Sequence, residues 1–558
     1  MEKIWHKFYE EDVPKILDYP QVSVSELLDK TALKFPGKTA LIFFGNKISY
    51  RELNSIVNRI ASALADIGVK KGDRIALILP NCVEFVIVYF AALKIGAIVV
   101  PTNPIYSHRE MEFQLKDCGA ETAVILDVLY NKYKDVLAGS PVTKCIITSI
   151  KDFLPLAKGL IFPIKMWLEH VDYKVEEKEG LFLFKNLLDK YEEISESVSI
   201  DMEDIALLQY TGGTTGVSKG VILTHRNLVA NAYQGRLWVP ILKDGQEKVL
   251  LVLPLFHIFA LTVGLNISVL LGASIILLPQ FKIKEVFKSL ENYKVTFFPA
   301  VPSLFVIMNN SPLIKKYKLS SLRFCISGGA ALPPEVLEKF EKITAVKIYE
   351  GYGLSEASPS THFNPITENR KKGTIGLPLP GTDMKIVKGT FFERNQAPEH
   401  EGELLISGPQ VMRGYWNRPD ETKKVLNKGW LHTGDIAKID EQGFCQIIDR
   451  KKEMILVGGN NVYPTEIEKI LYEKSEIQEA AVIGLPDKSR GEFIKAFVVL
   501  KEGAYLKEED VIDYCKENLS HIKVPRKVEF RNELPKSLIG KILKKVLKEK
   551  ELKKITQT

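Results

Sequence analysis

The sequence TGGTTGVSKG, residues 211–220, is the strongest indication of fold and chemistry in this chain, because it combines glycines, hydroxyl residues and one lysine. Glycines let backbone N–H groups approach phosphate oxygens, while hydroxyls and an ammonium group add donors and positive charge. Apolar runs typical of strands lie on both sides, at 204–210 and 220–224. Flexible linkers seldom lie between two such runs. The stretch therefore predicts a loop that binds a polyphosphate.

This loop differs from a phosphate loop of the Walker A type. A Walker A motif requires Gly-Lys followed by Ser or Thr, but here Lys219 is followed by Gly220. A Walker A loop also opens a helix, whereas a strand is expected on each side of this one. An ordinary P-loop NTPase is therefore not indicated.

Bulk composition limits the class of protein. A chain of 558 residues exceeds what one hydrophobic core usually serves, so at least two domains are expected. With 46% hydrophobic and 26% charged residues it is typical of globular proteins, and a net charge of +7 over this length does not indicate nucleic-acid binding. The six cysteines form no C-x-x-C pair, and the first twenty residues lack the apolar core of a secretory signal. We expect a cytoplasmic protein.

One long apolar stretch raises the question of a membrane span. Residues 249–281 contain no Asp, Glu, Lys or Arg, but Pro254, Gly264 and Gly272 interrupt them. The pattern divides into a strand at 249–253, a helix at about 258–271 and a strand at 273–278. A buried α/β unit is favoured over a transmembrane helix.

Alternating periodicity predicts the architecture of the larger part. Apolar residues at helical spacing between Leu53 and Ile67 end at Gly68, and they are followed by a strand at 75–79, a helix ending near Gly96 and a strand at 97–100. This β-α-β alternation predicts an α/β N-terminal domain of mixed sheets covered by helices.

A second, smaller domain is expected after the charged tetrad 449–452. Beyond it, strands are expected at 480–484, 493–500 and 527–530, with helices starting around Pro464 and near 508–517. We predict an N-terminal domain over 1–451, joined by a hinge to a smaller α+β domain over 452–558.

Two further motifs carry groups suited to a nucleotide. SGGAAL (327–332) and EGYGLSEAS (350–358) place small residues near Tyr352, Ser355 and Glu356, which can stack on a purine, bond a phosphate and hold Mg²⁺. HTGD (432–435) adds Asp435, a carboxylate that can accept hydrogen bonds from ribose, and Arg450 follows fifteen residues later. Taken singly, each also fits an ordinary surface residue or ion pair.

The order of the motifs carries more information than any one of them. TGGTTGVSKG, LPLFHIF, GGAAL, GYGLSE, EGELLISGP, GYWNRPDET, TGD, DRKKEMI and PKSLIGKILKK follow one another along nearly the whole chain. This series resembles the adenylate-forming superfamily of acyl-CoA synthetases, peptide-synthetase adenylation domains and firefly luciferase. The resemblance implies ATP, Mg²⁺ and coenzyme A as ligands.

The resemblance also implies roles for individual residues. The residues implied for nucleotide and CoA binding are Thr211, Gly212, Gly213, Thr214, Thr215, Gly216 and Lys219 at the phosphates, Gly329 and Tyr352 at adenine, Gly328, Ala330 and Gly353 beside them in the same two motifs, Asp435 and Arg450 at ribose, Lys452 at the hinge, and Gly458 and Gly459 in the loop of the pantetheine tunnel. The residues implied for catalysis are Ser355, Glu356 as the Mg²⁺ ligand, His257, and Lys541, which bridges the substrate carboxylate and the α-phosphate. His257 also fits a packed pocket histidine, and Lys541 also fits the basic face of a solvated helix.

The acyl-pocket motif LPLFHIFALT (253–262) bears on the substrate. It has no acidic residue to bind an amino-acid ammonium group, so an amino acid is disfavoured. Gly353 stands where acetate-specific relatives carry Trp and leaves the pocket open. The chain looks most like long-chain fatty acyl-CoA synthetases, although Leu261 replaces the gating Trp of some of them.

We therefore expect an AMP-forming ligase that joins a medium- to long-chain fatty acid to coenzyme A. The alternatives are an aryl-CoA ligase of the coumarate type, an acyl-AMP ligase feeding a carrier protein, a membrane-embedded fatty-acid transport protein and a nucleotide-binding pseudoenzyme. The apolar segment 153–167 fits either peripheral contact with the inner face of a membrane or a packed surface loop. A homodimer is left open.

Overall fold

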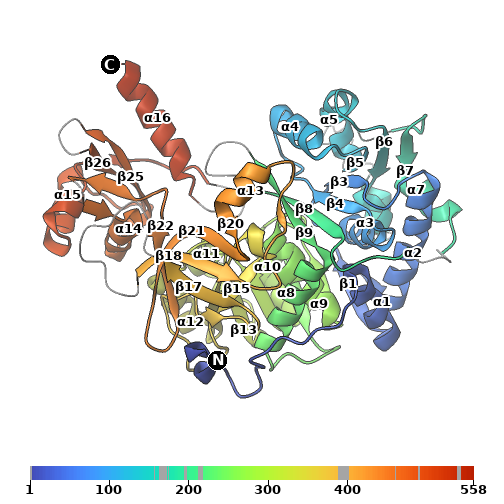
Figure 1. Cartoon of the computed structure of the whole chain (residues 1–558), viewed down its shortest axis with the longest axis horizontal. Coiled ribbons are helices and arrows are strands. Elements are labelled where there is room, and N and C mark those ends of the chain that lie inside the picture. Colours follow the sequence, from blue (N-terminus) through green and yellow to red (C-terminus); the bar gives the residue numbers. More distant parts are fainter. Residues whose placement is uncertain are drawn as a thin grey trace.

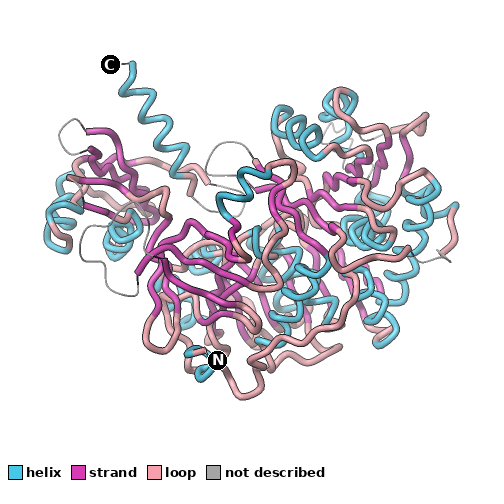
Figure 2. Tube along the Cα trace, viewed as in Figure 1, coloured by secondary structure: helices cyan, strands magenta, loops and turns pink. Residues whose placement is uncertain are grey.

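The computed structural model describes residues 3–155, 157–162, 173, 175–193, 198–211, 218–387, 401–458, 460–487, 491–536 and 542–557. Its strands form four sheets, and helices flank the two largest of them (Figures 1 and 2). The predicted mixed α/β body and smaller C-terminal α+β part are thereby confirmed.

The first sheet has nine strands in the order β16-β15-β14-β13-β12-β10-β11-β1-β2. Neighbours from β14 to β1 run parallel, while β2, β15 and β16 join antiparallel at the two edges. Its strands are β1 Thr39–Phe43, β2 Asn46–Ser49, β10 Lys248–Leu251, β11 Ser274–Leu277, β12 Phe297–Ala300, β13 Phe324–Ser327, β14 Lys347–Gly353, β15 Ser360–Phe363 and β16 Leu377–Pro378.

The second sheet has eight strands in the order β19-β9-β8-β4-β3-β5-β6-β7. It is parallel from β8 to β7, and β9 and β19 extend it antiparallel. Its strands are β3 Arg74–Ile78, β4 Ile98–Pro101, β5 Thr122–Leu126, β6 Lys144–Thr148, β7 Leu181–Leu183, β8 Ile205–Thr211, β9 Lys219–Thr224 and β19 Gly414–Tyr415.

Two smaller sheets follow in the sequence. The third is antiparallel and consists of β17 Asp383–Val387, β18 Glu401–Ser407, β20 Leu426–Asn427, β21 Trp430–Ile439 and β22 Cys445–Arg450. The fourth consists of β23 Ile455–Val457, β24 Asn460–Val462, β25 Ile477–Asp487, β26 Gly491–Leu500 and β27 Lys527–Phe530. Strands β22 and β23, on either side of the predicted boundary, thus belong to different sheets.

Helices cover the sheets by packing apolar side chains against them, as α2 shows. In α2 the capping box of Ser49 and Glu52 fixes the first turn, and Leu53, Val57 and Leu64 are fully buried. The helices of the body are α1 Val24–Lys34, α2 Tyr50–Asp66, α3 Val83–Lys94, α4 His108–Cys118, α5 Asp127–Ala138, α7 Phe184–Lys190, α8 His225–Trp238, α9 Ile267–Leu270, α10 Ile283–Asn292, α11 Pro302–Asn310, α12 Pro334–Thr344 and α13 Pro419–Val425. Those of the C-terminal part are α14 Pro464–Glu473, α15 Glu508–Asn518 and α16 Lys544–Gln557.

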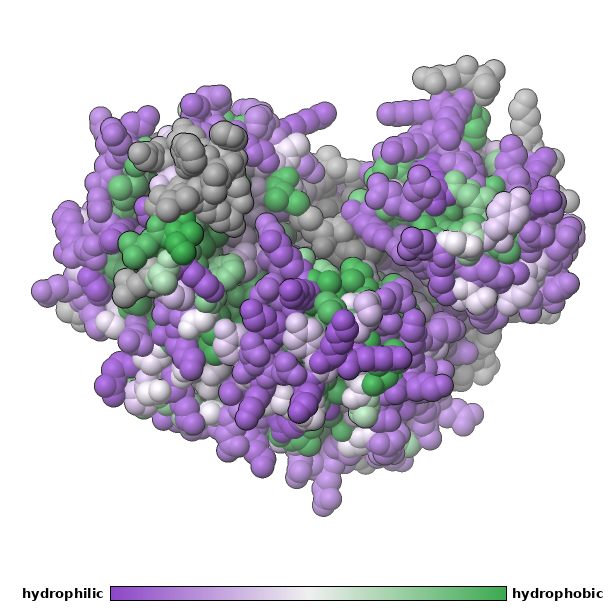
Figure 3. Space-filling view, turned by 180° about the vertical axis from the view of Figure 1, so that it is seen from behind, coloured by the Kyte–Doolittle hydropathy of each residue, from purple (hydrophilic) through white to green (hydrophobic). Residues whose placement is uncertain are grey.

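The C-terminal sheet and its helices form a separate lobe at the left of Figure 1, with the end of α16 pointing away from the body. Seen from behind in Figure 3, the surface is hollowed between this lobe and the body, and hydrophilic residues cover most of the lobe. The lobe has its own apolar core, which includes Val457, Ile467, Val498 and Val511.

The long apolar stretch folds as predicted. Residues 249–281 supply β10, a helical segment from 258 to 270 whose middle, Ala260–Asn266, is π-helical, and β11. Leu261 and Leu265 are fully buried. Within the parts of the chain that the structure describes, no helix is long and apolar enough to cross a membrane.

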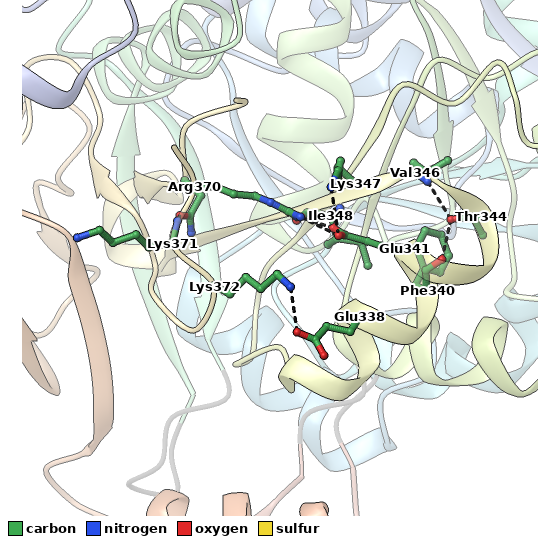
Figure 4. Close-up of polar contacts among 11 residues, drawn as sticks. Glu338, Phe340, Glu341, Thr344, Val346, Lys347, Ile348, Arg370, Lys371 and Lys372 are labelled. Atoms are coloured by element: carbon green, nitrogen blue, oxygen red, sulfur yellow. Dashed lines mark hydrogen bonds and ion pairs between the residues drawn. The ribbon is translucent and has the colours of Figure 1, made fainter. Parts of the chain in front are cut away.

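Part of the excess basic charge is neutralised locally, as the run 370–372 shows (Figure 4). Arg370 makes a two-pronged ion pair with Glu341, at 2.5 and 2.7 Å, and Lys372 pairs with Glu338 at 2.9 Å. Lys371 points the other way and lies 2.5 Å from Asp440. This run therefore links α12 to the loop that follows β21 and does not present a free basic patch.

Candidate active site

The edge of the first sheet gathers three of the sequence motifs. Strands β10, β13 and β14 are parallel, so the loops that follow them emerge at the same edge. These loops carry the acyl-pocket motif 253–262, the glycine loop 328–332 and the segment 353–358. Parallel topology thus explains why motifs a hundred residues apart come together.

The predicted phosphate loop joins β8 to β9 in an antiparallel hairpin. Thr211 and Lys219 are cross-strand partners, and the Ser218 hydroxyl donates to the Thr211 carbonyl oxygen at 2.6 Å. The strands on both sides confirm the expected setting and distinguish the loop from one that opens a helix. Five of the predicted phosphate residues, Gly212, Gly213, Thr214, Thr215 and Gly216, lie outside the described residues.

Lys219 projects from the start of β9 toward a neighbouring segment. Its Nζ lies 2.6 Å from Oε2 of Glu421 and 5.1 Å from the centroid of the Tyr415 ring. Hydrogen bonds from Lys219 and Lys424, together with their charges, lower the pKa of Glu421 to about 2. Glu421 is therefore ionised throughout the neutral range, and it fixes the position of the ammonium group.

Glu356 stands in the short turn Ser355–Ala357 that follows β14. The Tyr415 hydroxyl donates to its Oε1 at 2.8 Å, and the Met412 N–H donates to its backbone carbonyl at 2.8 Å. Among the residues that the structure describes, no three His, Cys, Asp or Glu side chains are grouped to hold a metal. A single carboxylate fits Mg²⁺, which commonly takes one or two protein ligands and completes its shell with water and phosphate oxygens.

Tyr352, Asp435 and Arg450 meet although they come from two different sheets. The Tyr352 hydroxyl donates to Oδ2 of Asp435, and Nε of Arg450 lies 3.2 Å from Oδ1. Asp435 and Arg450 are cross-strand partners in β21 and β22, which places the carboxylate only 4% exposed between a phenol and a guanidinium. Burial, and then the Asp435 charge, raise the pKa of Tyr352, so the phenol stays protonated as a donor.

The glycine loop after β13 ends in a hydrogen bond, from Leu332 to Glu350, that sequence reasoning missed. A Cβ on Gly328 would lie 3.2 Å from the Phe259 ring, and Gly329 has a φ of 83°, which favours glycine. Ala330 is partly exposed beside them. The Leu332 N–H donates to Oε1 of Glu350 at 3.1 Å, and burial raises the pKa of that carboxyl to about 7.

Gly353 is needed for a reason beyond the size of a pocket. A Cβ at this position would lie 2.2 Å from the carbonyl oxygen of Pro359, and the backbone there cannot turn aside as a side chain could. Gly353 is the cross-strand partner of Ser360 in β15. The close approach of β14 and β15 therefore requires glycine.

The acyl-pocket motif is hydrogen-bonded to β8 and to the segment that follows Glu356. The Gln209 amide donates to the Phe256 carbonyl at 3.0 Å, and the Thr262 hydroxyl donates to the Ser358 carbonyl at 2.6 Å. Burial lowers the pKa of His257 to about 4, and its Nδ1 accepts from the Phe259 N–H at 3.3 Å. His257 is thus neutral and bonded within its own segment, and its catalytic role stays a prediction.

The predicted hinge lies between β22 and β23, where Lys452 is exposed. Asp449 accepts from the Thr465 N–H at the start of α14 at 2.9 Å, and Lys544 Nζ lies 2.8 Å from Glu468 and 3.3 Å from Glu453. Sequence reasoning did not identify these ion pairs on the lobe side. Gly458 has a φ of 58°. Gly459 and Lys541 lie outside the described residues.

Comparisons with known proteins agree with this arrangement. The sequence model of the family described as AMP-binding enzyme matches residues 28–416, and that of the AMP-binding enzyme C-terminal domain matches 466–541. The chain is 44% identical over 553 residues to the long-chain-fatty-acid–CoA ligase of Bacillus subtilis, covering 99% of this chain and 98% of the relative. It is 39% identical over 561 residues to the enzyme of the same name from Salmonella typhimurium, covering 100% and 99%.

Solved structures give the same result. ATP-bound MatB from Rhodopseudomonas palustris superposes with a TM-score of 0.83 at 27% identity, covering 95% of this chain and 99% of that one. A Mycobacterium tuberculosis fatty acyl CoA synthetase superposes with a TM-score of 0.70 at 30% identity, covering 95% and 98%. This chain belongs to the AMP-binding enzyme family, whose members form adenylates.

Tyr415 and Glu421 are two site residues that sequence reasoning left without a role. Both lie in GYWNRPDET, which the motif series includes. Their contacts with Glu356 and Lys219 depend on pairing between β19 and β9, nearly two hundred residues apart in the sequence, and local pattern carries no sign of it.

Proposed function

We propose that this chain is an ATP-dependent, AMP-forming ligase that converts a long-chain fatty acid and coenzyme A to acyl-CoA. The observation that carries the proposal is similarity over the whole length to ligases of this name. Three of the motifs of this chain also lie at one edge of the first sheet. The reaction has two stages. The fatty-acid carboxylate first attacks the α-phosphate of ATP and releases pyrophosphate, and the thiol of CoA then attacks the acyl-adenylate and releases AMP.

We assign the nucleotide site to the groups around Tyr352 and Tyr415. Lys219, with Thr211 and the residues between them, contacts the phosphates, and Glu356 holds Mg²⁺, which offsets the charge of the phosphate oxygens when bound. The Asp435–Arg450 pair, of which Arg450 is partly exposed, and the Tyr352 ring receive the nucleoside. Ser355, beside Glu356, is the further phosphate contact.

The adenylation step brings two anions together, so a placed cation lowers its barrier. We assign this role to Lys541. The lobe over 452–558 then turns about Lys452, which withdraws Lys541 and opens the path along Gly458 and Gly459 to CoA. The exposed position of Lys452 between two separate sheets supports a hinge at this residue.

The acyl site is assigned to 253–262 and the helical segment that continues it. The segment carries no acid, and Leu261 and Leu265 are apolar and fully buried, which suits an aliphatic chain better than an amino acid. An aryl acid remains the alternative substrate. An acyl-AMP ligase that passes its product to a carrier protein remains the alternative acceptor class.

The first experiment is ATP–pyrophosphate exchange with acetate, octanoate, palmitate, coumarate and several amino acids, followed by thioester formation after CoA is added. Exchange that peaks with palmitate and yields thioester is the expected result. Exchange without thioester would transfer the acceptor role to a carrier protein, and the absence of exchange with every acid would refute the catalytic proposal.

We also propose that the enzyme works in the cytoplasm with peripheral contact at a membrane surface. Within 153–167, Leu160 is 78% exposed and Ile161 59% exposed, and the Lys158 ammonium donates to the Phe44 carbonyl at 2.8 Å. Cosedimentation with anionic vesicles should fall in a Leu160→Ser, Ile161→Ser variant whose exchange activity with soluble octanoate is unchanged. Equal cosedimentation of the two proteins would refute the membrane contact.

Sedimentation equilibrium without vesicles tests whether the enzyme is a homodimer, which the sequence leaves open.

A further inference from the structure

Tyr415 occupies a fixed position next to the outgoing strand of the phosphate loop. Strand β19 pairs with β9, so that Gly414 lies opposite Ile222 and Tyr415 opposite Val221. Backbone bonds on both sides, from the Trp416 N–H to Gly220 at 2.7 Å and from the Arg413 N–H to Ile222 at 3.1 Å, extend this pairing. The Tyr415 backbone therefore cannot shift independently of Lys219.

The Tyr415 side chain contacts two groups of opposite charge. Its hydroxyl donates to Oε1 of Glu356 at 2.8 Å, and its ring centroid lies 5.1 Å from the ammonium of Lys219. Glu356 and Lys219 come from different sheets, after β14 and at the start of β9. A single residue thus links the carboxylate assigned to Mg²⁺ with the ammonium assigned to phosphate.

The same segment also supplies a counter-charge for Lys219. Lys219 pairs with Glu421, which lies six residues after Tyr415, while Glu356 is bonded by a neutral phenol. The Tyr415 N–H donates to the Thr422 hydroxyl at 2.9 Å, which fixes the turn between these residues.

We propose that Tyr415 is a positioning residue for adenylation: its hydroxyl orients the Glu356 carboxylate toward the divalent cation, and its ring face holds the Lys219 ammonium. The inference rests on the nucleotide-site roles proposed above. A partner that hydrogen-bonds a metal-binding carboxylate restricts its rotation, and loss of such partners typically lowers metal affinity ~10- to 100-fold. An ammonium over an exposed aromatic ring gains ~0.5–1 kcal/mol, or roughly two- to fivefold in binding.

Two substitutions separate the two functions of the side chain. Tyr415→Phe removes the hydroxyl and keeps the ring, whereas Tyr415→Leu removes both. Mn²⁺ affinity is measured by electron paramagnetic resonance in the presence of a non-hydrolysable ATP analogue. Affinity for the analogue alone is measured by calorimetry in EDTA.

Tyr415→Phe should weaken Mn²⁺ binding about tenfold or more while leaving metal-free analogue binding unchanged. Tyr415→Leu should weaken Mn²⁺ binding as much and also weaken metal-free analogue binding about two- to fivefold. In adenylation assays the loss in Tyr415→Phe should be recovered at high Mg²⁺. A Tyr415→Phe enzyme that binds Mn²⁺ as tightly as the unmodified protein would overturn the inference.

Two controls accompany these variants. Tyr50→Phe removes a buried hydroxyl outside this site, which donates to the Ala273 carbonyl at 2.7 Å. This substitution should change neither affinity. Glu356→Gln separates the inference from the proposal beneath it. If Glu356→Gln weakens Mn²⁺ binding and Tyr415→Phe does not, only the role of Tyr415 is wrong; if Glu356→Gln also has no effect, the proposed metal site itself is wrong.

Discussion

Replacing Gly353 with alanine should destabilise the body of the protein, not merely narrow an acyl pocket. The added Cβ would lie 2.2 Å from the carbonyl oxygen of Pro359, 2.7 Å from its carbonyl carbon and 3.1 Å from the Cα of Ser360. All three are backbone atoms, so no side chain can move to relieve the contact. Strands β14 and β15 would have to separate where Gly353 pairs with Ser360.

The size of the effect follows from two terms. Forcing an extra methyl group into a packed site typically costs ~1–3 kcal/mol. Separation of the strands also weakens the bond from the Leu354 N–H to the Pro359 carbonyl, now 3.1 Å long. A hydrogen bond of this kind contributes roughly 1 kcal/mol. Together they predict a loss of about 2–4 kcal/mol in the free energy of unfolding.

The assay is urea unfolding followed by tryptophan fluorescence, alongside the fatty-acid chain-length profile in pyrophosphate exchange. Gly37→Ala is the matched control, because no atom lies within 4 Å of its added Cβ, and its stability should change by no more than ~0.5–1 kcal/mol. A Gly353→Ala protein that unfolds at the wild-type urea concentration but prefers shorter acids would refute this reasoning. It would show that the glycine serves only to open the pocket.

Three other outcomes are expected. Lys541→Ala should slow adenylation by at least ~100-fold and leave thioester formation from supplied acyl-adenylate nearly intact; equal losses in both half-reactions would contradict the role assigned to it. Asp435→Asn should weaken ATP binding about tenfold or more, since hydrogen bonds to charged groups are worth ~1.5–3 kcal/mol, and should abolish any preference for ATP over 2′,3′-dideoxy-ATP in calorimetry; a retained preference would remove Asp435 from the ribose site. Because burial lowers the pKa of His257 from 6.5 to about 4, its stabilising effect is complete above pH 6.5 and is lost as the pH falls toward 4. Wild-type melting temperature should therefore fall more steeply over that range than that of His257→Gln, by an amount equivalent to about 3 kcal/mol at most, and parallel curves would show that His257 is not the group involved.

Local patterns were sufficient for the elements but not for the links between them. The helical stripe from Leu53 to Leu64 and the two apolar runs around 211–220 predicted α2 and the β8–β9 hairpin, because periodicity and glycine placement are properties of neighbouring residues. The pairing of Asp435 with Arg450 needed the register of β21 and β22, which their spacing only suggested.

Contacts set by topology lay beyond sequence reasoning. Tyr415 reaches Glu356 because a two-residue strand joins the far edge of the second sheet, and nothing in the local pattern of β19 marks that pairing. Glu350 was quoted within its motif without a role, since nothing in the sequence marks the bond that its carboxylate accepts from the Leu332 N–H. The resemblance supplied residue roles, and the fold supplied the residues that support them.

The hairpin at the phosphate loop also limits how this site can change over evolutionary time. Thr211 and Lys219 are opposite each other at the loop end of the β8–β9 ladder, and a one-residue slip would turn the side chains of β9 to the other face of the sheet. Insertions or deletions within β8 or β9 should therefore be excluded, whereas substitutions there keep the register. For protein engineering, the same constraint means that any exchanged hairpin has to keep positions 211 and 219 as cross-strand partners.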